Sequence, residues 1–349
     1  MHDLLLVPTD HKVVMRRFSA SIIVIAAAIS VSACSSNLGG PGAPAAVNAT
    51  PSTSASDAAP IDNCGVSVPV AAPPKRIVTI KSSATELLLA LGLGKHIVGT
   101  AFLDGPIPAS IAGSTTTSAA PHSISEFLPS QEAVLALKPD FIYGGWESNF
   151  SADGVGERAS LAKLGIGTYV SPSACKEKAF VPDPLTFGTV FTEITEAGRI
   201  FGATKQADAL VTKQKAQLKA LAAAKPAVSA LWYSSGSTTP YVGAGIGAPE
   251  MIMKASGLRN IFADIHDTWS SVGWESVAAA NPRVIVLADS SWSSAAKKIG
   301  ILESNPVTKN LDAVVHKRFI VLPFASTEAG VRNVQAAASV IDQLKKLDH

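Results

Sequence analysis

The chain has 349 residues, more than one hydrophobic core of ordinary size accommodates, so we expect it to fold as two lobes. Hydrophobic residues make up 47% of it and charged residues 16%, a balance typical of a globular protein and unlike that of a disordered chain. The formal net charge is only +2 and no long basic run is present, which argues against a protein that binds nucleic acid through its phosphates.

The first part of the chain has the pattern of an export signal. Arg16 and Arg17 precede the apolar run 21–29, which is followed by small residues. A basic segment, an apolar segment and small residues before a cleavage point describe a signal peptide, which we place at residues 1–33. The apolar run is too short for a membrane span.

The motif VSAC at 31–34 resembles a bacterial lipobox, in which the chain is cleaved before the cysteine and lipid is attached to its sulfur. We therefore expect a lipid anchor on Cys34. The alternative is an ordinary signal peptide that is cleaved within the same tract of small residues. Met15, followed directly by Arg16 and Arg17, makes a more typical start for this pattern than Met1, and both residues are candidate starts.

Residues 34–63 consist largely of Gly, Pro, Ala, Ser and Thr, with almost no large apolar side chain. Such a segment cannot bury enough apolar surface to fold, so it is predicted to be a flexible tether.

Three cysteines are an odd number for an exported protein, in which a free thiol is undesirable. If Cys34 carries lipid, Cys64 and Cys175 remain to form one disulfide in an oxidising compartment. The alternative is a pair of unrelated thiols.

Beyond the tether, short β-rich runs alternate with helical patterns. In the N-terminal lobe, expected at residues 64–184, strands are predicted at 76–80, 96–100, 141–143 and 167–170. Helices are predicted at 84–91, 132–137 and 158–164. Strands that alternate with helices indicate crossover connections and a mostly parallel sheet.

A helical zone, residues 185–225, follows. Its first helix, 185–201, has apolar residues at helical spacing and ends at Gly202. Its second, 205–224, lacks Gly and Pro and would be about 30 Å long.

The βα pattern then resumes in a C-terminal lobe, expected at residues 226–349. Its segments are 229–233, 249–255, 283–288, 319–322 and a terminal helix at 331–347. Two βα lobes would therefore flank a helix that runs the length of the molecule.

Two blocks of sequence echo one another, QEAVLALKPDFIYGGW at 131–146 and WESVAAANPRVIVLADSSW at 274–292. In each, a glutamate, Glu132 or Glu275, heads a short helix, and a proline seven positions later ends it before a buried strand. A carboxylate in the first helical turn is stabilised by the helix dipole by about 0.3–1 kcal/mol, which is a structural explanation for either glutamate alone.

Four phrases carry a family resemblance: RIVTIKSSATELLLALGLGKHIVGT, EAVLALKPDFIYGG, LAKLGIGTYV and GLRNIFADIHDTWSSVGWESVAAANPRVIVLAD. Together, in order and over about residues 65–349, they resemble the class III periplasmic substrate-binding proteins, which serve ABC importers of iron–siderophores, haem and vitamin B12. The resemblance implies an α/β fold of two Rossmann-like lobes joined by a single long helix, with the ligand cleft between the lobes. It also implies that Glu132 and Glu275 dock onto arginines of the permease subunits.

In such a fold the ligand lies beyond the carboxyl ends of the strands, where aromatic side chains and a few polar groups line the cleft. The candidates by position are Phe102, Tyr143, Trp146, Tyr169, Tyr233, Tyr241, Trp269, Trp292, Phe324 and Arg332. Trp146, Trp269 and Arg332 also match cleft positions of the family. Arg332 would suit an anionic chelate or carboxylate, although it could instead begin a helix. For the aromatic residues the alternative is packing at a strand end.

Other classes of protein find little support in the sequence. The glycines of 243–248 do not have GxGxxG spacing, and no GxSxG, HExxH or Walker motif is present, so we expect no catalytic residues and no cofactor. A binder of free metal ions would need more ligands than His96, His122 and Asp104 provide, so no metal site is expected. An envelope lipoprotein without a transport role stays open as an alternative.

The sequence therefore predicts a monomeric, extracytoplasmic solute-binding protein, held to the membrane by lipid at Cys34, that delivers a ferric siderophore or haem to the permease of an ABC importer. Cobalamin or another large cofactor precursor is the alternative ligand.

Overall fold

The computed structural model describes residues 59–112, 122–223 and 225–347, which belong to one compact unit of the chain, Ser54–His349. The predicted signal peptide, Cys34 and most of the predicted tether lie outside the described residues. None of the helices in these three ranges is long and apolar enough to cross a membrane.

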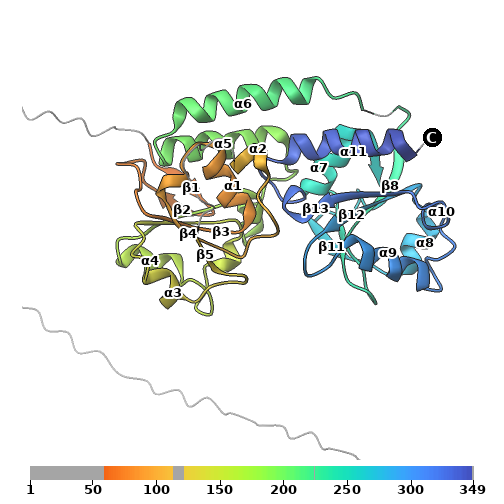
Figure 1. Ribbon diagram of the computed structural model, residues 1–349, viewed down its shortest axis with the longest axis horizontal. Coiled ribbons are helices and arrows are strands. Elements are labelled where there is room, and N and C mark those ends of the chain that lie inside the picture. The colour runs from red at the N-terminus through yellow and green to blue at the C-terminus, as the bar shows by residue number, and fades with distance from the viewer. Residues whose placement is uncertain (1–58, 113–121, 224, 348–349) are drawn as a thin grey trace, which may run out of the picture. The chain divides into compact units, whose positions relative to one another are not determined.

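The N-terminal lobe is built on five parallel strands in the order β5-β4-β3-β6-β7 (Figure 1). The strands are β3 (Ile77–Ile80), β4 (Ile97–Ala101), β5 (Ser123–Ser125), β6 (Phe141–Gly144) and β7 (Gly167–Val170). The crossover helices are α1 (Ser82–Ala90), α2 (Ala109–Ala112), α3 (Gln131–Leu135) and α4 (Arg158–Lys163). The predicted parallel sheet is confirmed, and β5 and α2 are additions that the sequence pattern did not reveal.

A two-stranded hairpin, β1 (Ile61–Asn63) and β2 (Val66–Val68), precedes this sheet. The predicted tether therefore extended too far, because its last residues, 61–63, form a strand. Asn63 fixes this strand to the edge of the sheet: its side-chain amide donates to the carbonyl of Val170 and its Oδ1 accepts from the Val170 N–H, both at 2.8 Å. The folded region thus begins before Cys64.

Two helices, α5 (Phe187–Ile200) and α6 (Thr204–Lys219), connect the lobes. They turn back on each other at Gly202, whose φ of +68° favours glycine. They approach closely because Gly198 has no Cβ, which would lie 2.5 Å from the Cβ of Ala207. Figure 1 shows α6 passing over α5 toward the C-terminal helix α11 (Asn333–Leu347). α6 ends before the predicted residue 224.

The C-terminal lobe has a six-stranded sheet in the order β11-β9-β8-β12-β13, with β10 also beside β8. The strands are β8 (Val228–Ser235), β9 (Tyr241–Gly243), β10 (Leu258–Asn260), β11 (Trp269–Ser271), β12 (Val284–Asp289) and β13 (Phe319–Pro323). The remaining helices are α7 (Ala248–Ser256), α8 (Trp274–Ala280), α9 (Ala295–Ser304) and α10 (Asp312–Val315).

The antiparallel pairs of this sheet, β8–β9 and β9–β11, depart from the parallel pattern that we expected. The chain reverses after β8 at Gly236, where φ is +86° and a Cβ would lie 2.1 Å from the carbonyl oxygen of Thr239. This tight turn forms an antiparallel hairpin in place of a crossover. Because β11 then pairs with β9, Tyr241 and Trp269 lie at the same edge of the sheet.

One continuous hydrophobic core joins the two lobes through the connecting helices. It contains Leu88 of α1, Ile194 of α5, Ile252 of α7 and Ala337 of α11. The lobes are therefore packed through buried apolar contacts as well as tethered by the chain.

Candidate functional site

A cavity of about 510 Å³ lies between the lobes. Its N-terminal wall comes from Trp146, which follows β6, and from several residues between 173 and 185, which follow β7. Its C-terminal wall comes from residues that end or follow β8, β12 and β13, and from β9 and β11. The cavity therefore lies where the carboxyl ends of parallel strands from both sheets meet, the usual place for a ligand in such folds.

Five of the predicted aromatic residues line this cavity, namely Trp146, Tyr241, Trp269, Trp292 and Phe324. Tyr241 and Trp269 lie on the paired strands β9 and β11 and stack with their ring centroids 5.9 Å apart and an interplanar angle of 16°. Trp292 and Phe324 follow the neighbouring strands β12 and β13, and their rings meet edge to face at 5.2 Å. The C-terminal lobe thus presents two aromatic pairs.

Trp146 is the aromatic residue that the N-terminal lobe contributes, and it is held from several sides. The ammonium group of Lys81 lies 3.8 Å from the centroid of its ring, and Phe102 meets it edge to face at 5.7 Å. Its indole N–H donates a hydrogen bond of 2.7 Å to the Oε2 of Glu328 in the C-terminal lobe. Trp146 therefore joins the two lobes at the cavity wall.

Lys81 is a buried cation with a buried partner. Its side chain is 1% exposed and forms an ion pair with Asp104, whose side chain is equally buried. The backbone of Lys81 has a φ of +77° and donates to the carbonyl of Ala101, at the end of the neighbouring strand β4. The pair is thereby fixed at the edge of the sheet directly beneath Trp146.

Arg332 does not line the cavity, in contrast to its predicted role. Its guanidinium forms a bidentate ion pair with Glu86 of α1, and it also donates to the carbonyl of Pro106. Both side chains of the ion pair are buried. Arg332 is therefore a second link between the lobes, and its charge is already neutralised.

Four other predicted aromatic residues also lie outside the cavity lining. Tyr143 and Tyr169 are strand residues that point toward α5, where their hydroxyls donate to Glu193 and Glu196 at 2.7 and 2.6 Å. Tyr233 is buried against Trp274, and its hydroxyl donates to the carbonyl of Gly236. Residues within a strand alternate between its faces, and these three tyrosines lie on faces that do not reach the cavity, unlike Tyr241 of β9 and Trp269 of β11. The ring of Phe102 packs against Trp146 and the ammonium group of Lys81 instead of lining the cavity.

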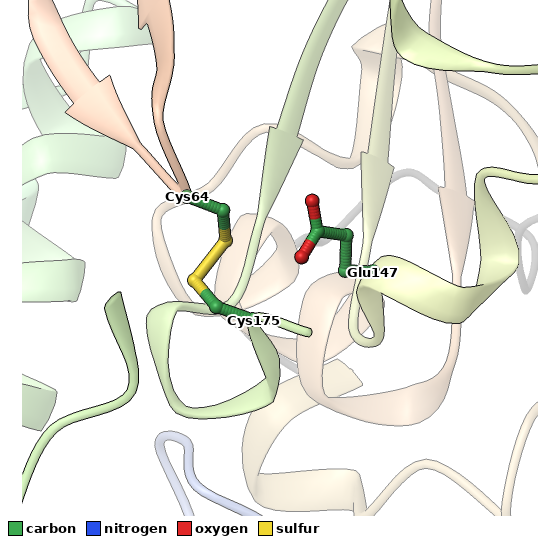
Figure 2. Close-up of side chains that lie close together, drawn as sticks. All are labelled: Cys64, Glu147 and Cys175. Carbon is green, nitrogen blue, oxygen red and sulfur yellow. A yellow bond between two sulfur atoms is a disulfide. The ribbon is translucent and has the colours of Figure 1, made fainter. Parts of the chain in front are cut away.

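The cavity wall that follows β7 is fastened by the disulfide between Cys64 and Cys175 (Figure 2). Cys64 occupies the turn between β1 and β2, and Cys175 lines the cavity. Beside it, the N–H of Lys176 donates to Glu147, the residue after Trp146, at 2.5 Å. The disulfide pairing predicted from the sequence is therefore present, and it holds one side of the cavity.

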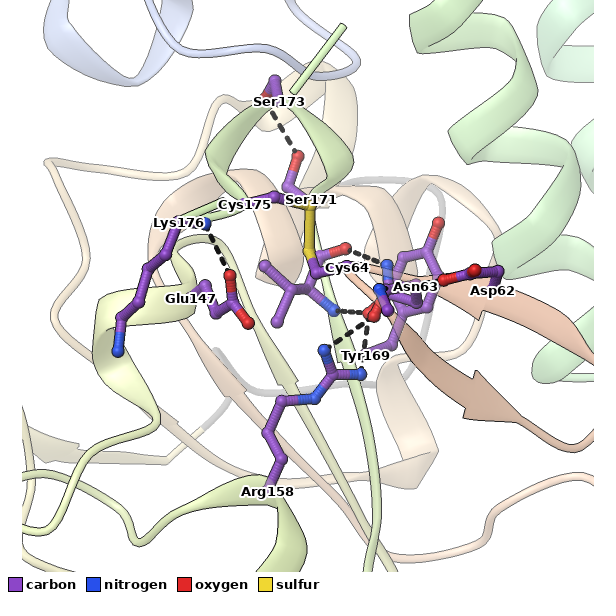
Figure 3. The surroundings of a disulfide bond; sticks show 12 residues. Asp62, Asn63, Cys64, Glu147, Arg158, Tyr169, Ser171, Ser173, Cys175 and Lys176 are labelled. Atoms are coloured by element: carbon purple, nitrogen blue, oxygen red, sulfur yellow. Dashed lines mark hydrogen bonds between the residues drawn. A yellow bond between two sulfur atoms is a disulfide. The ribbon is translucent and has the colours of Figure 1, made fainter. Parts of the chain in front are cut away.

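Buried polar contacts support the same hairpin (Figure 3). The guanidinium of Arg158 donates to the carbonyl and the side-chain oxygen of Asn63, at 2.8 and 2.9 Å, and to the hydroxyl of Thr168 at 3.0 Å. Burial lowers the pKa of Arg158, and Glu147 and Asp62 oppose this effect. The hairpin, the edge strand and the disulfide form one rigid support for the cavity wall.

Among the described residues, Cys64, Glu147 and Cys175 are the group of metal-ligand types whose donor atoms come within 4.8 Å of one another. Both sulfurs are engaged in the disulfide, and it is the thiolate that binds a metal. The remaining carboxylate is not sufficient for a metal site.

The paired glutamates occupy equivalent positions, one in each lobe. Glu132 lies in the first turn of α3 and Glu275 in the first turn of α8. Both are exposed. The N-terminus of α3 is capped by Ser130, whose Oγ accepts a hydrogen bond from the N–H of Ala133.

Three carboxylates of the cavity lining, Asp183, Asp267 and Glu328, were missed by sequence reasoning. Asp183 precedes α5, and its Oδ2 lies 2.8 Å from Nε2 of His266 in the other lobe. Burial raises the pKa of Glu328, while the hydrogen bond from Trp146 and the charge of Lys81 lower it. No local motif marks these residues, because the fold brings them together from distant loops.

Comparison with known proteins identifies a family. A family model described as "Periplasmic binding protein" matches residues 77–325. The chain is 25% identical over 280 residues to the uncharacterised ABC transporter substrate-binding lipoprotein YvrC of Bacillus subtilis, a match that covers 78% of this chain and 80% of that protein. It is 25% identical over 218 residues to a vitamin B12-binding protein of Yersinia pestis, a match that covers 61% of this chain and 69% of that protein.

Solved structures are similar as well. A protein of Saccharomonospora viridis described as an ABC-type Fe3+-hydroxamate transport system superimposes with a TM-score of 0.68 and 25% sequence identity. The superposition covers 81% of this chain and 98% of that one.

Proposed function

The chain belongs to the periplasmic binding protein family, and from this premise we propose that it captures a bulky organic metal chelate or corrinoid and delivers it to an ABC importer. Family membership makes it an extracytoplasmic binding protein and not an enzyme. The observation that carries the proposal is the cavity between the lobes, about 510 Å³ in volume and lined by five aromatic side chains. Such a lining suits a large ligand with apolar faces.

Three ligand classes are named among the similar proteins. The relative from Yersinia is named for vitamin B12, and the structural neighbour from Saccharomonospora for Fe3+-hydroxamate transport. Further structures with this fold, at 18–20% identity, are named for haem, among them one from Vibrio cholerae. Ferric siderophore, corrinoid and haem are therefore the candidates, and haem ranks third because these neighbours are less similar and because Arg332, the expected anion contact, is paired with Glu86.

We also propose that Glu132 and Glu275 are the points at which the protein docks onto the permease. Each carboxylate is exposed at the start of a helix, one on each lobe, so arginine side chains of a partner can reach both. The lipid anchor on Cys34 remains a proposal too. It is supported by the VSAC motif and by the description of the Bacillus relative as a lipoprotein.

Tryptophan fluorescence tests ligand capture, because three tryptophans line the cavity. Titration with a ferric trihydroxamate or with cyanocobalamin should quench the emission and reach saturation. If no ferric chelate, haem or corrinoid changes the emission, the proposed function is wrong.

Charge reversal tests delivery separately from capture. Glu132→Arg combined with Glu275→Arg should abolish uptake in cells while the purified protein keeps its ligand affinity. Glu157→Arg, at another exposed glutamate beside a short helix, is the matched control and should leave uptake unchanged. Loss of ligand affinity in the double variant would contradict a docking role.

A further inference from the structure

We propose that the cavity selects chelates or corrinoids that are neutral or positively charged, and that it discriminates against those with anionic outer groups. This inference rests on the proposed function, whose ligand it defines more narrowly. It follows from the charges that line the cavity and from the pairing of the buried cations beside it.

Carboxylates outnumber ammonium groups in the cavity lining. The carboxylates are Asp183, Asp267 and Glu328, whereas the ammonium groups are those of Lys176 and Lys178. Both lysines are exposed, and so are Asp267 and Asp183, which contacts His266 of the same lining, so solvent ions screen these four charges alike. Glu328, in contrast, lies behind Trp146 and is fixed by the hydrogen bond from its indole N–H.

Lys81, which lies against Trp146, and Arg332, which links the lobes, do not offset these carboxylates. Lys81 is paired with Asp104 and Arg332 with Glu86, and all four side chains are buried. A ligand anion therefore finds no free cation in either of these pairs.

Tyr241 shows which sign of charge prevails at the stacked aromatic pair. Burial raises the pKa of its hydroxyl, and the charges that act on it, Asp267 and Glu328, raise that pKa further. Its partner Trp269 lines the same part of the cavity. A ligand that stacks against this pair therefore experiences the negative charges of Asp267 and Glu328.

The lining carboxylates affect a ligand most strongly once the ligand has displaced water from the cavity. When a ligand fills the cavity and excludes water, the effective dielectric constant falls, and repulsion between carboxylates grows. Propionates, citrate carboxylates and catecholates would face this repulsion. Amide and ammonium groups would instead donate hydrogen bonds to Asp267 and Glu328.

The test compares probes that differ in charge, by fluorescence titration of the full mature protein at low ionic strength. The probes are cyanocobalamin (neutral), ferrioxamine B (a cationic ferric trihydroxamate), haemin (with two propionates) and ferric citrate. Cyanocobalamin or ferrioxamine B, or both, should bind at least ten-fold more tightly than haemin and ferric citrate. Tighter binding of haemin or ferric citrate would overturn the charge inference and leave the proposed function intact, whereas the absence of any binding would refute both.

A single substitution then tests the charge directly. Asp267→Asn should weaken the binding of ferrioxamine B on the order of five-fold, strengthen that of haemin to a similar degree, and reduce the salt dependence of both. Asp264→Asn is the matched control, because Asp264 is exposed on the same loop but does not line the cavity. Equal effects of the two substitutions, or no effect of Asp267→Asn on either probe, would contradict the proposal.

Discussion

The two lobes build their halves of the cavity by different means. In the N-terminal lobe, Trp146 and the loop after β7 are held by buried charges and a covalent bond, through Lys81, Arg158 and the Cys64–Cys175 disulfide. In the C-terminal lobe, the aromatic side chains contact one another, Tyr241 with Trp269 and Trp292 with Phe324, and Phe324 also lies 5.4 Å from the ammonium group of Lys81.

This difference predicts that substitutions in the two halves of the cavity have different effects on stability and on ligand affinity. Removing one partner of a buried ion pair strongly destabilises the wall that it supports, whereas ring contacts at a cavity surface can rearrange at little cost. The C-terminal lobe does contain a buried lysine, Lys298, but its ammonium group donates to the carbonyls of Ala288 and Ser293 and not to a carboxylate. We therefore expect substitutions in the N-terminal wall to reduce stability, and those in the C-terminal wall to reduce ligand affinity.

The largest effect is expected for Lys81→Met. The substitution leaves the carboxylate of Asp104 buried without its cation, and breaking such a pair costs about 3–5 kcal/mol of unfolding free energy. Urea unfolding followed by circular dichroism measures the loss. Lys81→Met/Asp104→Asn is the control, and it should recover a substantial part because no uncompensated charge remains. A single variant as stable as the wild type would remove the basis for contrasting the two walls.

Removal of the disulfide should have the next largest effect. Its cysteines are 111 positions apart, and Cys64→Ser/Cys175→Ser should reduce the unfolding free energy by about 2–4 kcal/mol. Because Cys175 lines the cavity, ligand affinity should fall as well. A reducing agent should lower the stability of the wild type but not that of the variant; equal sensitivity of the two would show that the disulfide does not support this wall.

Glu193 gives the N-terminal lobe a dependence on pH. Burial, opposed in part by the hydrogen bond from Tyr143, raises the pKa of this carboxyl from 4.5 to about 7. Because the folded chain then binds the proton more tightly than the unfolded chain, this stabilisation is full below pH 4.5 and is lost as the pH rises through 7.

Glu193→Gln should remove this dependence. Between pH 4.5 and pH 8 the wild type should lose roughly 2–3 kcal/mol of unfolding free energy relative to the variant, as measured by urea unfolding at several pH values. Parallel pH profiles for the two proteins would contradict the assignment to Glu193.

The fold could be predicted from the sequence to a large extent, because strand and helix periodicities are local properties. The Cys64–Cys175 pairing could also be predicted, because only these two cysteines remained once Cys34 was assigned to lipid. The presence of Trp146 and Phe324 in the cavity could also be predicted. Both follow the ends of strands, and a parallel sheet places such residues at one edge, where the ligand binds.

Charge partners could not be predicted in this way. Arg332 appeared free in the sequence, yet Glu86, which neutralises it, is 246 positions away. Lys81 and Asp104 gave no signal either, because their pairing depends on how two neighbouring strands end. Tyr143 and Tyr169 were misplaced because the face on which a strand residue lies depends on where the helices pack. The cavity wall was therefore predictable, but the electrostatics behind it were not.

The smallest effects on stability, and the clearest on binding, should come from the aromatic pairs. Trp269→Ala removes one ring of a stacked pair at the cavity surface, so ligand affinity should fall by about ten- to thirty-fold, or about 1.4–2 kcal/mol, with little change in urea unfolding. Trp146→Ala should reduce affinity and stability together, because it also exposes Lys81 and leaves Glu328 without its hydrogen bond. If both variants lost affinity and stability in the same proportion, the two halves of the cavity would not differ in the way their structures indicate.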